Sequence, residues 1–204
     1  AALATRFGAS SGTVRRALDE LAADHLVERR QGSGTFVATH AAPRQSFRFL
    51  RLVPDDDDST FTRELLSCHR MRATAHIARS LNLRTSEPVI EIRRLLRRRD
   101  RPVVLDELWL PERHFDGLNA EVLEGHTGAL YALFEAQFGV HMVRAEEKLR
   151  AVAATRETAR LLCVAEREPL LSVERVAFTY GDRPVELRRG LYCTASDHYR
   201  NDLN

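Results

Sequence analysis

The chain has 204 residues, and its 31 Lys and Arg against 29 Asp and Glu give a net charge of +2. This length suits one large or two modest domains. Because the charges nearly balance, the chain as a whole lacks the strong positive charge that would by itself indicate nucleic-acid binding. The three cysteines, Cys68, Cys163 and Cys193, match no metal or disulfide spacing, which favours reduced thiols in a cytoplasmic protein. No apolar run approaches the roughly 20 residues of a membrane span. We therefore expect neither a membrane partner nor a metal or other cofactor.

Helical spacing dominates the first 26 residues. Leu3 and Phe7 lie one helical turn apart, and from Val14 the apolar residues recur at the i, i+3, i+4 and i+7 positions of one helix face. The connection between the two helices falls at Gly8-Ala9, and Ser10 is a good N-cap for the second helix. The pattern predicts a helix-turn-helix, with small residues and arginines on the outer face of the second helix.

A predicted hairpin follows directly. Residues 27–30 and 35–38 can pair across Gln31-Gly32-Ser33-Gly34, whose glycines permit the positive φ of a tight turn. An amphipathic helix alone more often reflects ordinary core packing. The full order of helix, Gly turn, Ser-rich helix start, Arg pair and Gly-rich hairpin favours a DNA-binding head.

The sequence FGASSGTVRRALDELAADHLVERRQGSGTFV resembles the winged helix-turn-helix of the GntR family of bacterial transcription regulators. The resemblance implies a double-stranded DNA operator as partner. With the neighbouring Arg16, the residues predicted to approach DNA are Arg6, Ser10, Ser11, Gly12, Thr13, Arg15, Arg16, Gln31 and Gly32. The family often has an arginine where this chain has Ser11, so a base contact is expected to be lost here or moved to Arg16.

The charge of the head favours a dimer. Residues 1–38 contain five arginines against four acidic residues, so one head should bind DNA weakly, and we expect a homodimer that reads an inverted repeat. Because the chain starts inside a helix of the motif, we also expect the first helix of the head to be missing, which leaves open whether this chain still binds DNA. The expected organisation is a DNA-binding head at 1–40, a linker at 41–46 and a control domain at 47–204.

The control domain is predicted to be α+β, with one mainly antiparallel sheet and helices on one side. Strands are expected at 46–53, 63–72 and 140–154, and the run Asp55 to Asp58 reads as a solvated loop rather than a cation site. Helices are expected after the caps Thr74, Thr127 and Thr155, the second ending at Gly139. Two similar segments, 87–106 and 168–186, each begin with Glu-Pro and contain Arg-Pro-Val at the turn, which indicates two related hairpins in one sheet.

Polar residues inside these hairpins are candidates for a binding site. Arg94 shares a strand face with Ile92 and Leu96, whereas most of the other arginines around the turn, Arg97, Arg98, Arg99 and Arg101, should form a solvated tip. Asp106 lies across the hairpin, where an Arg94–Asp106 pair could line a cavity or equally be a structural ion pair. Glu186 and Tyr192 lie at an even spacing on the last strand and so share one face. Tyr131 has a hydroxyl that needs a partner.

The phrases RPVVLDELWLP, GALYALFEAQFG and RPVELRRGLY resemble the UTRA ligand-sensing domain of the HutC-type branch of the GntR family. That domain has a chorismate-lyase-like fold, and the resemblance implies an effector pocket lined by Arg94, Asp106, Tyr131, Glu186 and Tyr192. In sugar-phosphate sensors a second arginine stands where this chain has Leu96, and a serine stands where it has Ala129. Because a phosphate dianion needs several donors, these departures favour a carboxylate or small polar effector anchored by Arg94.

The resulting hypothesis is a transcription regulator, a repressor that a small metabolite releases from its operator. The alternative is a small-molecule enzyme of chorismate-lyase-like fold, although no nucleophile–base pair, metal set or phosphate loop is found and no catalytic residue is predicted. A third reading is an architectural DNA protein without an effector.

Overall fold

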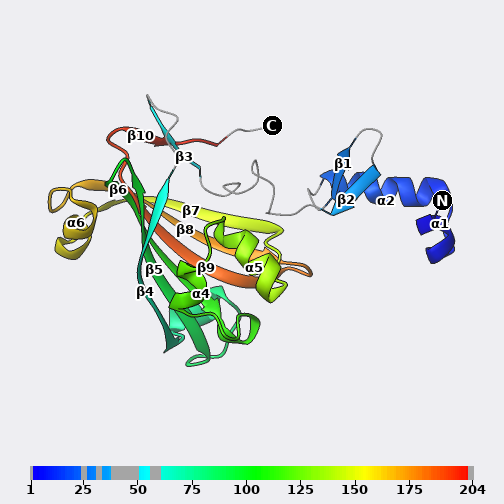
Figure 1. The fold of residues 1–204 in the computed structure, drawn as a ribbon, viewed down its shortest axis with the longest axis horizontal. Helices are drawn as coiled ribbons and strands as arrows, with labels where there is room; N and C mark the ends of the chain where they lie inside the picture. Colours follow the sequence, from blue (N-terminus) through cyan, green and yellow to red (C-terminus); the bar gives the residue numbers. More distant parts are fainter. Residues whose placement is uncertain (1, 24–26, 31–33, 38–50, 56–60, 202–204) are drawn as a thin grey trace. The chain divides into compact units, whose positions relative to one another are not determined.

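The computed structural model of the protein describes residues 2–23, 27–30, 34–37, 51–55 and 61–201 (Figure 1). The chain divides into two compact units, Ala1–His40 and Ala41–Asn204, and each is described by itself. Among the helices described, none is long and apolar enough to cross a membrane.

The first unit contains two helices and a hairpin. Its elements are α1 (Ala2–Phe7), α2 (Ser11–Ala23), β1 (Val27–Arg30) and β2 (Gly34–Val37), the last two paired antiparallel. Gly8 turns the chain between the helices at φ 58°, and the Ser10 hydroxyl accepts from the Thr13 amide at 3.1 Å, which confirms the predicted N-cap. Val14, Leu18 and Ala22 are half-buried along one stripe of α2, whereas Ala17 and Leu21, which the helical spacing placed on the same face, are exposed.

The second unit is built on a six-stranded antiparallel sheet. In spatial order its strands are β4 (Thr62–Arg72), β5 (Pro88–Arg98), β6 (Arg101–Pro111), β9 (Arg183–Tyr192), β8 (Pro169–Thr179) and β7 (Arg144–Ala153). A separate two-stranded sheet pairs β3 (Leu52–Pro54) with β10 (Asp197–Tyr199). The strand predicted at 140–154 begins at Arg144, and the part of the 46–53 strand before residue 51 lies outside the described residues.

Helices cover both faces of the six-stranded sheet, so the expectation of helices on one side is wrong. Successive strand residues alternate between faces, and Ile92 packs with α5 (Leu130–Phe138), whereas Leu95 packs with α6 (Arg156–Leu162). The short helix α4 (Ala120–Glu124) follows the 3-10 turn η1 (Glu112–His114) and packs on the α5 side, and α3 (Ala75–Ser80) packs on the opposite face with Val89. The inner strands of the sheet thus have two faces to bury, and a single helical layer would leave one of them exposed.

The predicted internal repeat is confirmed at the level of hydrogen bonds. Thr74 caps α3 by accepting from the Ile77 amide, and Thr155 caps α6 by accepting from the Thr158 amide. Each helix then leads through a turn into a hairpin, β5–β6 in the first half and β8–β9 in the second. The two halves meet where β6 pairs with β9, and this junction lies at the centre of the sheet.

One local prediction is wrong. Thr127 does not cap α5, whose N-cap is Ala129 and makes no side-chain capping bond; Gly139 does end the helix, at φ 63°. Among the arginines of the predicted solvated tip, Arg99 and Arg101 are exposed, whereas Arg98 faces inward: only 8% of it is exposed, its guanidinium pairs with Asp197 and it stacks 4.5 Å from the centre of the Phe61 ring.

Candidate functional site

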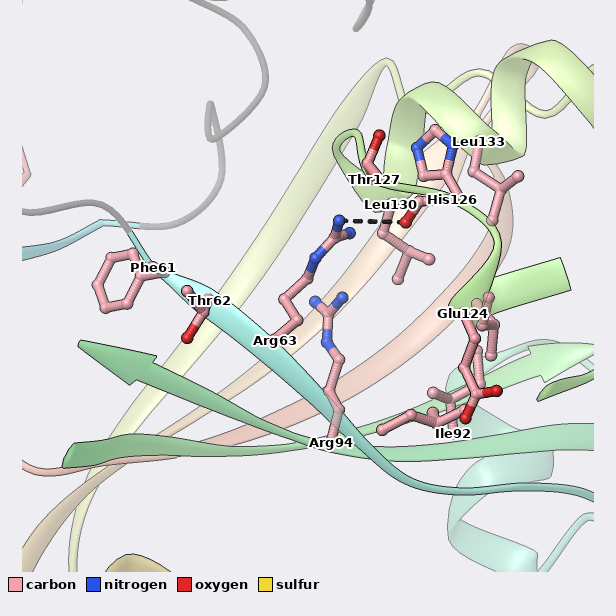
Figure 2. Close-up of a pocket in the computed structure, with 12 residues that line it drawn as sticks. Phe61, Thr62, Arg63, Ile92, Arg94, Glu124, His126, Thr127, Leu130 and Leu133 are labelled. Carbon is pink, nitrogen blue, oxygen red and sulfur yellow. Dashed lines mark hydrogen bonds between the residues drawn. The ribbon is translucent and has the colours of Figure 1, made fainter. Parts of the chain in front are cut away.

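A cavity of about 450 Å³ opens between the β4–β5 edge of the sheet and the segment that joins α4 to α5 (Figure 2). Its polar lining comes from Thr62, Arg63, Arg94, Glu124, His126 and Thr127, and its apolar lining from Phe61, Leu65, Ile92, Leu123, Leu130 and Leu133. A volume of this size suits a small metabolite, and the mixture of apolar walls with a few charged groups is typical of such sites.

Arg94 enters this cavity from β5, where the predicted alternation places it on the face of Ile92. Its guanidinium is nine-tenths buried, and its Nε and one Nη each lie 2.9 Å from the same Asp106 oxygen. Asp106 is the cross-strand partner of Arg94, as the hairpin predicted. Both alternatives offered by the sequence therefore hold in part: the pair is a buried ion pair, and its arginine lines a cavity.

Asp106 is shared by two guanidinium groups. It is fully buried, and Arg188 from β9 donates through Nε to its other oxygen at 2.6 Å. Burial by itself would raise the pKa of Asp106, but the charges of Arg188 and Arg94 outweigh burial, and the pKa is lowered. The carboxylate therefore stays ionised and fixes the guanidinium of Arg94 in place.

A second buried carboxyl, Glu186, lies two residues before Arg188. The Tyr131 hydroxyl donates to its Oε1 at 2.6 Å, while Oε2 has no hydrogen-bond partner among the described residues. Burial raises the pKa of Glu186, although Arg188 and the Tyr131 hydrogen bond act in the opposite direction. Tyr192 is buried at the end of the same strand, with its ring over Gly190, where an added Cβ would collide with the ring.

Of the five effector residues predicted, Arg94 lines the cavity, and the other four form the buried network behind it. The structure brings Arg94 together with Asp106, and Tyr131 with Glu186, with Arg188 adjoining both carboxyls. An effector contact by Asp106, Tyr131, Glu186 or Tyr192 remains a prediction.

Sequence reasoning missed Arg63. This residue lies on β4 directly across from Leu96, so it faces the same side of the sheet as Arg94, whose own partner on β4 is Leu65. Its Nη2 is 3.4 Å from the His126 carbonyl, and Figure 2 shows both guanidinium groups in the same space. Strand alternation from the predicted 63–72 strand could have indicated this orientation, but the pairing with β5 was not predictable from that strand alone.

The candidate nucleic-acid surface lies at the start of α2. Ser10, Ser11, Gly12, Thr13, Arg15 and Arg16 are exposed there. Asp19 neutralises Arg29 of the hairpin, whereas Arg15 and Arg16 form no ion pair within the described part of the chain. Arg6 on α1 is also exposed, 5.6 Å from the centre of the Phe7 ring, and Gln31 and Gly32 lie outside the described residues. Small residues and free arginines at a helix N-terminus are suited to contact phosphates and base edges.

Comparison with known proteins decides the family. Residues 58–200 match the UTRA domain, and residues 1–37 match the bacterial regulatory proteins of the gntR family. The chain is a GntR-family transcription regulator with a UTRA domain.

Individual relatives agree with this assignment. The regulator is 28% identical over 205 residues to the mannosyl-D-glycerate transport/metabolism system repressor MngR of Escherichia coli (strain K12), covering 99% of this chain and 83% of that protein. It is 31% identical over 198 residues to the HTH-type transcriptional regulator Rv0792c of Mycobacterium tuberculosis, and the match covers 91% of this chain and 69% of that protein. The crystal structure of the ligand-binding domain of a GntR-family regulator from Bordetella bronchiseptica superposes with a TM-score of 0.75 and 55% identity, over 77% of this chain and 98% of that one.

GntR-family regulators bind DNA operators and small-molecule effectors, and relatives of this chain are named repressors. The family and the relatives support a regulator rather than an enzyme, although the UTRA fold is chorismate-lyase-like. In this GntR regulator the gntR-family match lies in the first unit and the UTRA match lies in the second.

Proposed function

We propose that this regulator acts as a homodimer on an inverted-repeat operator and leaves it when a small anionic metabolite enters the cavity beside Arg94. In this proposal residues 1–40 form the DNA-binding head, 41–46 the linker, and 47–204 the unit that binds the effector and holds the dimer together. A carboxylate is the simplest group that Arg94 could anchor.

The observation that carries the proposal is the position of Arg94. Its guanidinium borders a cavity large enough for a metabolite, while Asp106 and Arg188 hold it rigidly from behind. A rigid, preoriented cation costs little to organise when an anion binds. An anion inserted at this point would alter the balance of the buried network that spans β5, β6 and β9, the central strands of the unit.

On the DNA side, the proposal assigns base and phosphate contacts to the exposed start of α2. Arg15 and Arg16 project from the first two turns of this helix, which in a helix-turn-helix lies in the major groove. Because one head is nearly neutral overall, two heads on one operator supply the affinity that a single head lacks. The effector can release the regulator from DNA only to the extent that its affinity for the released form exceeds its affinity for the DNA-bound form.

The test is operator release. Metabolites are screened by thermal shift with the full-length regulator, and each stabilising compound is added to an operator-binding titration. Arg94→Gln should abolish release while operator affinity in the absence of effector stays unchanged; Arg72→Gln, an exposed arginine on β4 outside the cavity lining, is the matched control. Arg15→Ala should weaken operator binding, since it removes a cation from the DNA face.

Two results would contradict the proposal. One is release by the effector that persists in Arg94→Gln. The other is operator binding at physiological salt that Arg15→Ala leaves unchanged. A measured stoichiometry of one protomer per operator would contradict only the proposed homodimer.

A further inference from the structure

We propose that Arg63 is a specificity-determining residue of the effector site, and that with Arg94 it adapts the cavity to a doubly negative oxyanion group. The inference rests on the proposed function, because it concerns the same cavity. It assigns a role to a residue on β4 that no sequence motif singled out.

The sheet register places Arg63 directly opposite Leu96, the position at which sugar-phosphate sensors have a second arginine. Leu96, two residues beyond Arg94 on β5, carries no charge, and Arg63 is its direct partner on β4. Side chains of directly paired strand residues lie about 5 Å apart at Cβ. A guanidinium from Arg63 can therefore reach the space beside Leu96, so the neighbouring strand restores the second cation.

The two arginines differ in how their charges are compensated. Arg94 has Asp106, whereas Arg63 has no carboxylate within 4 Å among the described residues and donates only to the His126 carbonyl, at 3.4 Å. Burial lowers the pKa of Arg63, and the positive charge of Arg94 lowers it further. An anion between the two guanidinium groups would relieve this repulsion and supply the missing partner.

The backbone adds a third positive group to the same wall. Ala129 provides no side-chain cap for α5, and Leu130, the first residue of that helix, lines the cavity. The amide end of a nine-residue helix carries a partial positive charge and favours an anion nearby. Glu124 is the one acidic residue of the lining; it is exposed on α4 and makes no ion pair with either arginine.

The consequence is a change in the expected effector. Leu96 and Ala129 favoured a carboxylate or small polar effector over a phosphate, but Arg63 compensates for the first of these departures. Arg94 shares Asp106 with Arg188, and Arg63 has no carboxylate partner among the described residues, so the cavity wall has positive charge in excess. A dianion gains from both Arg63 and Arg94, whereas a monocarboxylate needs only Arg94. The shared chemistry is that of a phosphate monoester or a compact dicarboxylate.

The test compares three probes of similar size on the full-length regulator by calorimetric titration: glycerol 3-phosphate, succinate and glycerate. The wild type should bind at least one of the two dianions about tenfold more tightly than glycerate, and which one it prefers distinguishes a phosphate from a dicarboxylate. Arg63→Gln should weaken dianion binding by about tenfold or more, the usual effect of losing a charged hydrogen bond, and should leave glycerate nearly unchanged. Arg70→Gln removes an exposed arginine of the same strand that pairs with Glu112, and it should behave as wild type.

The outcomes separate this inference from the proposed function. If Arg94→Gln abolishes probe binding and Arg63→Gln does not, the anchor stands and the role of Arg63 is refuted. If neither Arg94→Gln nor Arg63→Gln changes probe binding, both the proposed function and the inference about Arg63 are refuted. Equal binding of glycerate and the dianions, equal losses in Arg63→Gln and Arg70→Gln, or no binding of any probe at millimolar concentration would each overturn the inference.

Discussion

Asp106 and Glu186 are two fully buried carboxyl groups on neighbouring strands, and replacing each carboxyl by an amide should destabilise the fold to different extents. Asp106 accepts from Arg94 at 2.9 Å and from Arg188 at 2.6 Å, whereas Glu186 accepts a single hydrogen bond from Tyr131, on one of its two oxygens. Asp106→Asn leaves two buried guanidinium groups without a counter-charge and should cost about 3–5 kcal/mol at pH 7. Glu186→Gln keeps an acceptor for Tyr131 and should cost about 1–2 kcal/mol.

The two substitutions should also differ in their dependence on pH. The pKa of Asp106 is lowered in the fold, so its stabilising contribution is present above the ordinary aspartate pKa of about 3.9 and is lost as pH falls through the folded value. The pKa of Glu186 is raised, so its contribution is greatest below the ordinary glutamate value of about 4.3 and is lost as pH rises through the folded value. The deficit of Asp106→Asn should therefore shrink on acidification, and that of Glu186→Gln should shrink as pH rises.

Urea unfolding followed by tryptophan fluorescence measures both effects in the full chain. Trp109, the single tryptophan, lies on β6 and donates to Glu91 at 2.9 Å, so its signal reports this sheet. With a slope of about 2 kcal/mol per molar urea, Asp106→Asn should lower the unfolding midpoint by about 2 M. A loss in Asp106→Asn no larger than that in Glu186→Gln at pH 7, or deficits that change with pH in the same direction, would refute the electrostatic reasoning.

Three further changes test individual contacts. Gly190→Ala should cost about 1–3 kcal/mol in the same urea assay, because the new methyl group collides with the Tyr192 ring, and a cost near zero would show that the ring moves freely. Gly139→Ala should cost about 1–2 kcal/mol through its left-handed backbone alone, since no atom lies within 4 Å of the added Cβ, and Gly139→Asn should recover part of the loss. Tyr131→Phe removes the hydrogen bond that lowers the pKa of Glu186, so this folded-state pKa should rise further and the loss of stability should extend to higher pH; an unchanged pH profile would contradict this.

Much of the fold was predictable from local chemistry. The threonine caps of α3 and α6, the glycine that ends α5 and the twin Glu-Pro hairpins each follow from residues close together in the chain. The Arg94–Asp106 pair was predictable for the same reason, because one hairpin fixes its register. Thr127 shows the limit of such reasoning, since a good capping residue stands two positions before the actual N-cap and lines the cavity instead.

The remainder depended on pairings between distant segments. Nothing near residue 94 in the sequence indicates that Arg188 shares Asp106, because this contact arises where the two halves of the sheet meet. Arg63 was overlooked for the same reason: its position opposite Leu96 follows from the pairing of β4 with β5. The sequence also did not indicate that Arg98 is the buried arginine of the turn, because its partner, Asp197, is 99 residues away on β10.

The internal repeat allows the arginine that lines the cavity to be compared with its counterpart in the other half of the sheet. In the second half, Arg175 on β8 corresponds to Arg94 on β5, and its direct partner on the edge strand is Glu147, which accepts from Arg175 Nε at 2.6 Å. In the first half the edge-strand partner of Arg94 is Leu65. The edge strand of the second half therefore supplies a carboxylate to its arginine, whereas the edge strand of the first half supplies Leu65 and leaves Asp106 as the carboxylate partner of Arg94.

This correspondence makes a direct prediction. Leu65→Glu should place a carboxylate opposite Arg94, as Glu147 lies opposite Arg175, and so compete with any anionic effector. Glycerol 3-phosphate and succinate binding should be lost in Leu65→Glu but retained within a few-fold in Leu65→Gln, which has the same shape without the charge. At pH 7 the glutamate variant should unfold at higher urea than the glutamine variant, because its carboxylate gains the two arginines as partners, and this difference should disappear at a pH low enough to protonate the carboxylate. Anion binding retained in Leu65→Glu, together with lower stability than Leu65→Gln at pH 7, would show that the position beside Arg94 does not accept a carboxylate.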